Sequence, residues 1–221
     1  MNLGEAAIAF VVFLFSLTIH EAAHAWTSEK FGDDTGRWLG RVSLNPAVHI
    51  DPVGTVLFPL ITLLTAGTIY FGWAKPVPVN PSRWKDHFWG NIAVSGAGPA
   101  SNLILAFIAG ALFKILLMTG LWTNLAGAGL QEPIGFLLRF MIMLNIGLAV
   151  FNMIPIPPLD GSHILSSLLS VISPTLMDAY EGLREYGFII LLVAIVTGLL
   201  NMICAPVFKL VTLGLVFILG L

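Results

Sequence analysis

Long apolar runs separated by short polar stretches occupy most of the chain. Because a helix that crosses a bilayer needs about 20 mainly apolar residues, these runs predict membrane-spanning helices. The fold class expected is an all-α integral membrane protein, a polytopic helical bundle of about five to six membrane segments. The predicted segments lie at residues 5–26, 91–118, 134–154 and 187–204, with a short apolar tail at 207–221 that would make a further one.

The run from Val53 to Trp73 is also apolar over 21 residues, but it contains Pro59 and many threonines and glycines. We expect it to form a small re-entrant or β-hairpin element between the first two core helices. Around it, residues 38–44 alternate enough to suggest a short strand. The stretch from Gly72 to Pro81 reads as an edge strand, because its prolines remove ladder donors along one side.

The composition supports a membrane protein and excludes several other classes. Hydrophobic residues make up 57% of the chain and charged residues 10%, with a mean hydropathy of +0.92. The net charge of −2 argues against a nucleic-acid partner. The single cysteine, Cys204, excludes an intrachain disulfide and a cysteine zinc cage. After the spans are laid out little sequence remains, so we expect one membrane-embedded domain, residues 1–221.

The first group of candidate functional residues is the motif His20-Glu21-Ala22-Ala23-His24, at the end of the first apolar run. Residues four apart share a face of a helix, so His20 and His24 can bind one metal ion while Glu21 lies beside it as a base. Such residues near the end of a membrane helix are costly unless they have a function. The alternative is that the histidines and glutamate are solvated interfacial residues.

A catalytic zinc ion usually has three protein ligands and a water molecule, so a third ligand is needed from elsewhere. Asp160 is the best candidate, because it follows three prolines that break an apolar span and a carboxylate there would be costly without a partner. An ordinary interfacial turn is the alternative for Asp160, and a second alternative is that His163 serves as a supporting or substitute ligand. The full set of candidates is His49, Glu132, Asp160, His163, Asp178, Glu181 and Glu185.

Three motifs resemble the signature motifs of the site-2 protease family of intramembrane zinc metalloproteases. They are His20–His24, Gly98-Pro99-Ala100-Ser101-Asn102, and residues 152–161, Asn-Met-Ile-Pro-Ile-Pro-Pro-Leu-Asp-Gly. The resemblance covers almost the whole chain. Within the family, the chain is similar to the small subgroup that lacks a PDZ domain. It implies that one Zn²⁺ is bound by His20, His24 and Asp160, that Glu21 is the catalytic base, and that the substrate is a transmembrane segment of another protein. It also implies that Asn102 and Asn152 face the substrate or the active site.

The shared metal ion constrains the topology. His24 lies near the C-terminal end of its helix and Asp160 lies past the end of another, so both ends must reach one side of the bilayer. This requires the run at 53–73 to be re-entrant. Most basic residues then fall on the side of the zinc site, which the positive-inside rule places toward the cytoplasm. These residues are Lys30, Arg37, Arg41, Lys75, Arg83, Lys85 and Arg184, against Lys114 and Arg139 near the other side.

The sequence therefore predicts an integral protein of a prokaryotic cell membrane that cuts a transmembrane protein substrate in the lipid bilayer. A homo-oligomer or an accessory regulator is left open. One alternative function is a zinc or other metal transporter that uses the same ligands without hydrolysis. Another is a different membrane zinc hydrolase, such as a prenyl-protein protease, which predicts a downstream glutamate ligand in place of Asp160.

Overall fold

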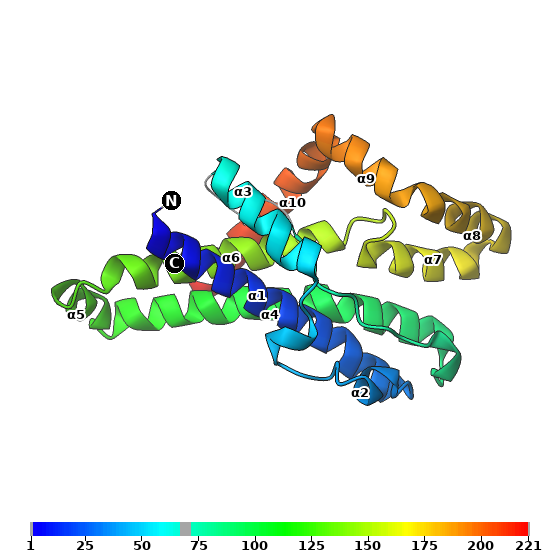
Figure 1. Cartoon of the computed structure of the whole chain (residues 1–221), viewed down its shortest axis with the longest axis horizontal. Coiled ribbons are helices and arrows are strands. Elements are labelled where there is room, and N and C mark those ends of the chain that lie inside the picture. Colours follow the sequence, from blue (N-terminus) through cyan, green and yellow to red (C-terminus); the bar gives the residue numbers. More distant parts are fainter. Residues whose placement is uncertain (1, 67–71, 221) are drawn as a thin grey trace.

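Apolar helices of membrane length dominate the fold (Figure 1). The computed structural model describes residues 2–66 and 72–220. Within those residues, four helices are long and apolar enough to cross a membrane, judged by length and composition. They are α1 (Leu3–Phe31), α4 (His87–Met118), α6 (Gln131–Asn152) and α10 (Leu199–Leu219). The all-helical membrane class is confirmed, whereas the count of five to six segments stays a prediction.

Shorter elements connect these helices. The helical ones are α2 (Thr35–Trp38), α3 (Phe58–Ala66), α5 (Leu121–Gly127), α7 (Asp160–Ile172), α8 (Pro174–Glu181) and α9 (Gly187–Val196). A π-helical turn at Pro52–Leu57 leads into α3. Single 3-10 turns lie at Pro46–Val48, Pro81–Arg83 and Gly182–Tyr186. The break between α7 and α8 falls at Ser173, directly before Pro174.

Helices α1, α4 and α6 lie side by side, with α4 antiparallel to the other two (Figure 1). Small residues stand where the helices approach closely, among them the fully buried Ala9 and Ala106. Such residues are favoured between membrane helices because they allow the backbones to come near one another. Phe13 and Ile146, also buried, fill the spaces between them. As a result, the C-terminal ends of α1 and α6 point toward the same end of the bundle.

The segment between α1 and α4 leaves and returns at that same end. The amide of Lys85 donates to the carbonyl of Phe31 at 2.9 Å, which joins the end of α1 to the start of α4. Further inside the segment, the amide of Trp73 donates to the carbonyl of Gly54 at 3.1 Å. The two flanks of the apolar run 53–73 are therefore adjacent, although part of that run, residues 67–71, lies outside the described residues.

Asp33 ties the start of this segment to its end. Its fully buried carboxylate accepts hydrogen bonds from the hydroxyl of Ser28 at 2.9 Å, the amide of Thr35 at 3.0 Å and the amide of Asn80 at 2.7 Å. Burial alone raises the pKa of a carboxyl group, but these donors outweigh burial and hold the pKa of Asp33 below its ordinary value. The ionised form of Asp33 therefore fixes the extended chain before α4.

The strand predicted at residues 38–44 is wrong, and no strand is present in the residues that the structure describes. Helix α2 ends at Trp38 instead, and the amide of Arg41 closes a turn on the carbonyl of Gly36 at 2.7 Å. The buried guanidinium of Arg41 then bonds the carbonyls of Val48 and Lys75. The stretch from Gly72 to Pro81 is irregular and forms no ladder, because its donors bond to other partners.

The boundary predicted between residues 204 and 207 is also wrong. The break comes earlier, where α9 ends at Val196 and Gly198 adopts φ 76°, a left-handed conformation that glycine allows. Pro206, which lies between the two predicted segments, is inside α10. A proline removes only one backbone hydrogen bond, and a long apolar helix tolerates that loss.

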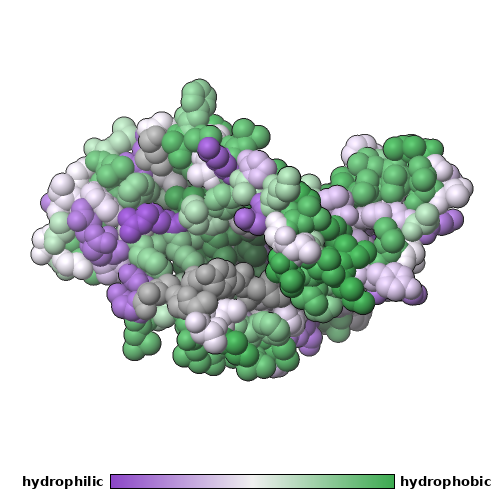
Figure 2. Space-filling model, turned by 90° about the horizontal axis from the view of Figure 1, so that it is seen from above, coloured by the Kyte–Doolittle hydropathy of each residue, from purple (hydrophilic) through white to green (hydrophobic). Residues whose placement is uncertain are grey.

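Apolar side chains cover most of the face seen in Figure 2, with polar residues in smaller patches. Many residues of the long helices are large, hydrophobic and exposed, including Ile104 and Phe107 in α4 and Leu210 and Phe217 in α10. An exposed surface of this kind is unfavourable in water and suits contact with lipid.

Candidate metal centre

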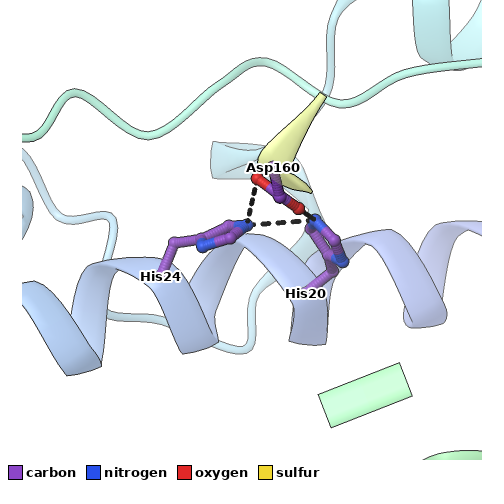
Figure 3. Close-up of side chains that lie close together, drawn as sticks. All are labelled: His20, His24 and Asp160. Carbon is purple, nitrogen blue, oxygen red and sulfur yellow. Dashed lines mark hydrogen bonds and ion pairs between the residues drawn. The ribbon is translucent and has the colours of Figure 1, made fainter. Parts of the chain in front are cut away.

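Three side chains from two distant parts of the chain converge on one point (Figure 3). His20 and His24 extend from one face of α1, and their Nε2 atoms are 3.0 Å apart. Asp160, the first residue of α7, faces both. Its Oδ2 lies 3.3 Å from Nε2 of His20 and its Oδ1 lies 3.4 Å from Nε2 of His24. The structure thus brings together the three residues that the sequence predicted as metal ligands.

Hydrogen bonds on the far side of each ring define which nitrogen carries the proton. Nδ1 of His20 lies 2.7 Å from Oδ1 of Asn102, and Nδ1 of His24 lies 2.6 Å from the carbonyl oxygen of Val94. Both partners are acceptors, so each Nδ1 must be the donor. In the neutral rings both Nε2 atoms then present lone pairs to each other and to the carboxylate of Asp160. Two imidazole nitrogens and a carboxylate that face one point form a site that a metal cation can fill.

The carboxylate of Asp160 also supports a cation at this point. Its Oδ2 is buried and has no hydrogen-bond partner in the described structure. A buried carboxylate oxygen without a partner is costly. Two imidazoles and one carboxylate form a ligand set that catalytic zinc sites use, with the fourth position left for water. The residues present therefore fit a zinc ion.

The loop after α6 places Asp160. Residues 153–159 include three prolines, which end the helix, and the amide of Leu159 donates to the carbonyl of Ile156 at 2.9 Å. Buried Leu159 then packs with Ile154 and with Leu191 of α9. The side chain of Asn91 in α4 holds α7 from the other side, through the carbonyl of His163 at 3.0 Å.

Glu21 lies next to His20 on α1 and faces the stretch between Gly72 and Pro81. Its Oε2 accepts the amide hydrogen of Val77 at 2.9 Å. The amide of Lys75 is also engaged, because it donates to the carbonyl of His49 at 2.8 Å. The edge strand expected from the sequence therefore uses these two donors within the chain.

A cavity of about 620 Å³ contains the metal centre and Glu21. Its volume is within the range of small-molecule binding sites. Most of the wall is apolar and comes from the stretch at 72–81, from α6 and from α9. The apolar wall residues include Leu17, Trp73, Val77, Leu148, Phe151, Phe188 and Leu191.

The other candidates have different surroundings. Asn102 is fully buried behind His20, so it has no surface free for a substrate in this structure. Asn152 lines the cavity, while its amide donates to the carbonyl of Leu148 at 3.0 Å. His163 also lines the cavity, and burial lowers its pKa. The remaining candidates, His49, Glu132, Asp178, Glu181 and Glu185, do not belong to the metal-ligand cluster in the described residues.

Two residues near the centre were not singled out from the sequence. Gly98 packs directly on the metal ligands: a Cβ atom there would lie 2.4 Å from Nε2 of His24 and 2.6 Å from Nε2 of His20. Asn145 of α6 is fully buried and bonds Asn102. The small-residue motif around Gly98 was a usable signal for the first. A lone asparagine in an apolar run was the only signal for the second.

The fold and this centre together define a membrane zinc metalloprotease. The chain matches the family model "Peptidase family M50" over residues 118–195, which contain Asp160. It is 40% identical over 199 residues to "Putative zinc metalloprotease YwhC" of Bacillus subtilis, covering 89% of this chain and 83% of the relative. It is 30% identical over 198 residues to "Putative zinc metalloprotease Rip2" of Mycolicibacterium smegmatis, covering 90% and 70%. No solved structure matches the chain.

The chain therefore belongs to peptidase family M50, the site-2 protease family, as its motifs predicted. It is a zinc metalloprotease, and its apolar helices make it a membrane protein.

The close approach of Gly98 gives a test of the centre. We expect Gly98→Ala to lower zinc affinity at least tenfold, because the added methyl group occupies space beside both Nε2 atoms. The matched control is Gly96→Ala in the same helix, where a Cβ atom meets nothing within 4 Å. Competition with a chromogenic chelator measures both affinities. Equal zinc affinities for the two variants would contradict this placement of the metal.

Proposed function

We propose that the protein is an intramembrane endopeptidase that hydrolyses a peptide bond in or beside a transmembrane segment of another membrane protein. The observation that carries this proposal is the position of the metal centre inside a bundle of membrane-length helices. His20 lies 11 residues before Phe31, the last residue of α1, which is about 16 Å along the helix. The cavity around the centre is mostly apolar, which suits a segment taken from lipid.

His20, His24 and Asp160 hold the zinc ion in this proposal. When bound, zinc supplies a Lewis acid that polarises a carbonyl group and lowers the pKa of water. Glu21 takes a proton from the attacking water on a carboxylate oxygen and later gives it to the nitrogen of the leaving amine. Asn102 keeps the ring of His20 in place, and Asn152 on the cavity wall is the residue we expect to meet the substrate backbone.

A helical substrate must be unwound before hydrolysis, since its carbonyls are bonded within the helix. The stretch at 75–79 could hold the unwound chain by strand addition. The amides of Lys75 and Val77 are already bonded to His49 and Glu21, so pairing through them requires those bonds to break. The apolar walls of the cavity are therefore the better holder for the substrate side chains.

We further propose that the run at 53–73 is re-entrant and that the centre faces the cytoplasm. Its flanks are joined by the bond between Trp73 and Gly54, so the run starts and ends on one side. The helical part from Pro52 to Ala66 is at most about 23 Å long, against a hydrocarbon core of about 30 Å. Seven basic residues lie outside the spans on the side of the centre or in the last turn of α1, which favours the cytoplasm.

Glu21→Gln separates protease chemistry from metal binding. We expect zinc content to stay at the wild-type level and cleavage to fall about 10²- to 10⁴-fold, since the general base is lost but no ligand is. The assay coexpresses the protein with single-span membrane proteins tagged at both ends, and mass spectrometry locates the cut. Glu29→Gln, on the same helix but paired with Arg37 outside the cavity, is the control and should change neither quantity.

Two results would contradict the proposed function. One is cleavage by Glu21→Gln at the wild-type rate. The other is a set of cuts that all lie far outside the membrane segments of the substrates. Zinc transport into vesicles that is unaffected by Glu21→Gln would favour the alternative of a metal transporter.

The re-entrant run predicts a pattern of cysteine labelling. The experiment uses a Cys204→Ser background and an impermeant thiol reagent added to one side of the membrane at a time. We expect Thr65→Cys in α3 to be labelled from the same side as Ser82→Cys, or from neither side. Ser82 is exposed on the side of the centre, and Thr123→Cys, exposed in α5, reports the opposite side. Labelling of position 65 from the side of Thr123 alone would show a full crossing.

A further inference from the structure

We propose that Asn145 in α6 is a positioning residue for the metal centre, acting on His20 through Asn102. This inference rests on the proposed binding of zinc by His20. Asn145 lies on a different helix from both of those residues and does not face the cavity. Its connection to the centre is a chain of buried hydrogen bonds between side chains of α1, α4 and α6.

The first link sets the orientation of the Asn102 amide. Oδ1 of Asn102 accepts the proton of Nδ1 in His20 at 2.7 Å, and Nδ2 of Asn102 donates to Oδ1 of Asn145 at 2.8 Å. If the amide of Asn102 turned over, two oxygens would face each other and two donors would face each other. The carbonyl of Asn145 therefore forces Asn102 to present an acceptor to His20.

The second link sets the orientation of Asn145 itself. Its Nδ2 donates to the hydroxyl oxygen of Ser16 at 2.9 Å and to the carbonyl of Met141 at 2.8 Å. The backbone carbonyl of Met141 can only accept, so the Oδ1 atom of Asn145 must be the one that faces Asn102. Ser16 lies one helical turn before His20 in α1, and the hydrogen bonds therefore close a ring that returns to the helix carrying the ligand.

Burial makes this ring effective. Ser16, Asn102 and Asn145 are each 0% exposed, so water cannot replace a lost partner. A histidine that binds metal through Nε2 needs its proton on Nδ1, and partners of that Nδ1 proton change metal affinity 10- to 100-fold. Asn145 does not touch His20 itself but bonds its partner Asn102. We therefore expect its loss to lower zinc affinity about tenfold.

A purely structural role would also make Asn145 sensitive to substitution, and the two roles differ in their dependence on Asn102. If Asn145 acts through Asn102, removing Asn102 first leaves Asn145 nothing to orient. If Asn145 only supports packing between α1 and α6, its effect is the same with or without Asn102. A double-mutant cycle measures this difference.

The experiment measures the zinc dissociation constant by chelator competition for the purified full-length chain. The variants are Asn145→Leu, Asn102→Ala and the double variant, and the visible absorption of bound Co²⁺ reports ligand geometry. We expect Asn145→Leu to weaken zinc binding about tenfold and shift the Co²⁺ spectrum, and to have less than a twofold effect in the Asn102→Ala background. Thr212→Val, which removes a hydrogen bond inside α10, is the matched control.

Two outcomes would overturn the inference: zinc affinity unchanged within twofold in a folded Asn145→Leu variant, or an equal loss in both backgrounds. If Asn145→Leu does not fold, Ser16→Ala decides, because it removes one of the two hydrogen-bond partners that hold the Asn145 amide in place. We expect Ser16→Ala to lower zinc affinity about threefold, again only when Asn102 is present. An equal loss of affinity with and without Asn102 would overturn the inference. His20→Ala tests the metal site separately, since zinc affinity unchanged in that variant would refute the proposed function itself.

Discussion

The structure depends on bringing a carboxylate to two imidazoles whose Nε2 atoms carry no proton. His20 and His24 direct Nε2 lone pairs at Asp160 because Asn102 and Val94 take the Nδ1 protons. Without a cation this arrangement is unfavourable, because like partial charges face one another in a largely buried site. With zinc it becomes a binding site. Metal binding and the packing of the three central helices are therefore linked.

That requirement explains the path of the chain. The ligands lie on α1 and on α7, which follows α6, so α1 and α6 must run in the same direction with α4 between them. The segment from α1 to α4 must consequently return to the end from which it left, as the bond between Lys85 and Phe31 shows. The same return brings Val77 against Glu21, so one constraint places both the metal ligands and the base beside the cavity.

Much of this followed from the sequence, since long apolar runs, histidines four residues apart and a carboxylate after three prolines are local signals. The membrane helices and the meeting of Asp160 with His20 were predicted on that basis. Two of the failed predictions, the strand at 38–44 and the edge strand at 72–81, concerned backbone hydrogen-bond donors. The strand at 38–44 was replaced by a turn that buries Arg41, and the partners of Lys75 and Val77 came from distant segments. Asn145 was missed because its role depends on contacts between three helices, which no periodicity encodes.

The most direct test of the central claim is the X-ray absorption spectrum of zinc in the purified protein. Zinc bound by His20, His24 and Asp160 predicts two imidazole nitrogens and oxygen neighbours at about 2.0–2.2 Å, with no sulfur. Asp160→Ala should then keep the signal of both imidazoles and change the oxygen shell. A sulfur neighbour at about 2.3 Å, or a spectrum that His20→Ala leaves unchanged, would contradict the account.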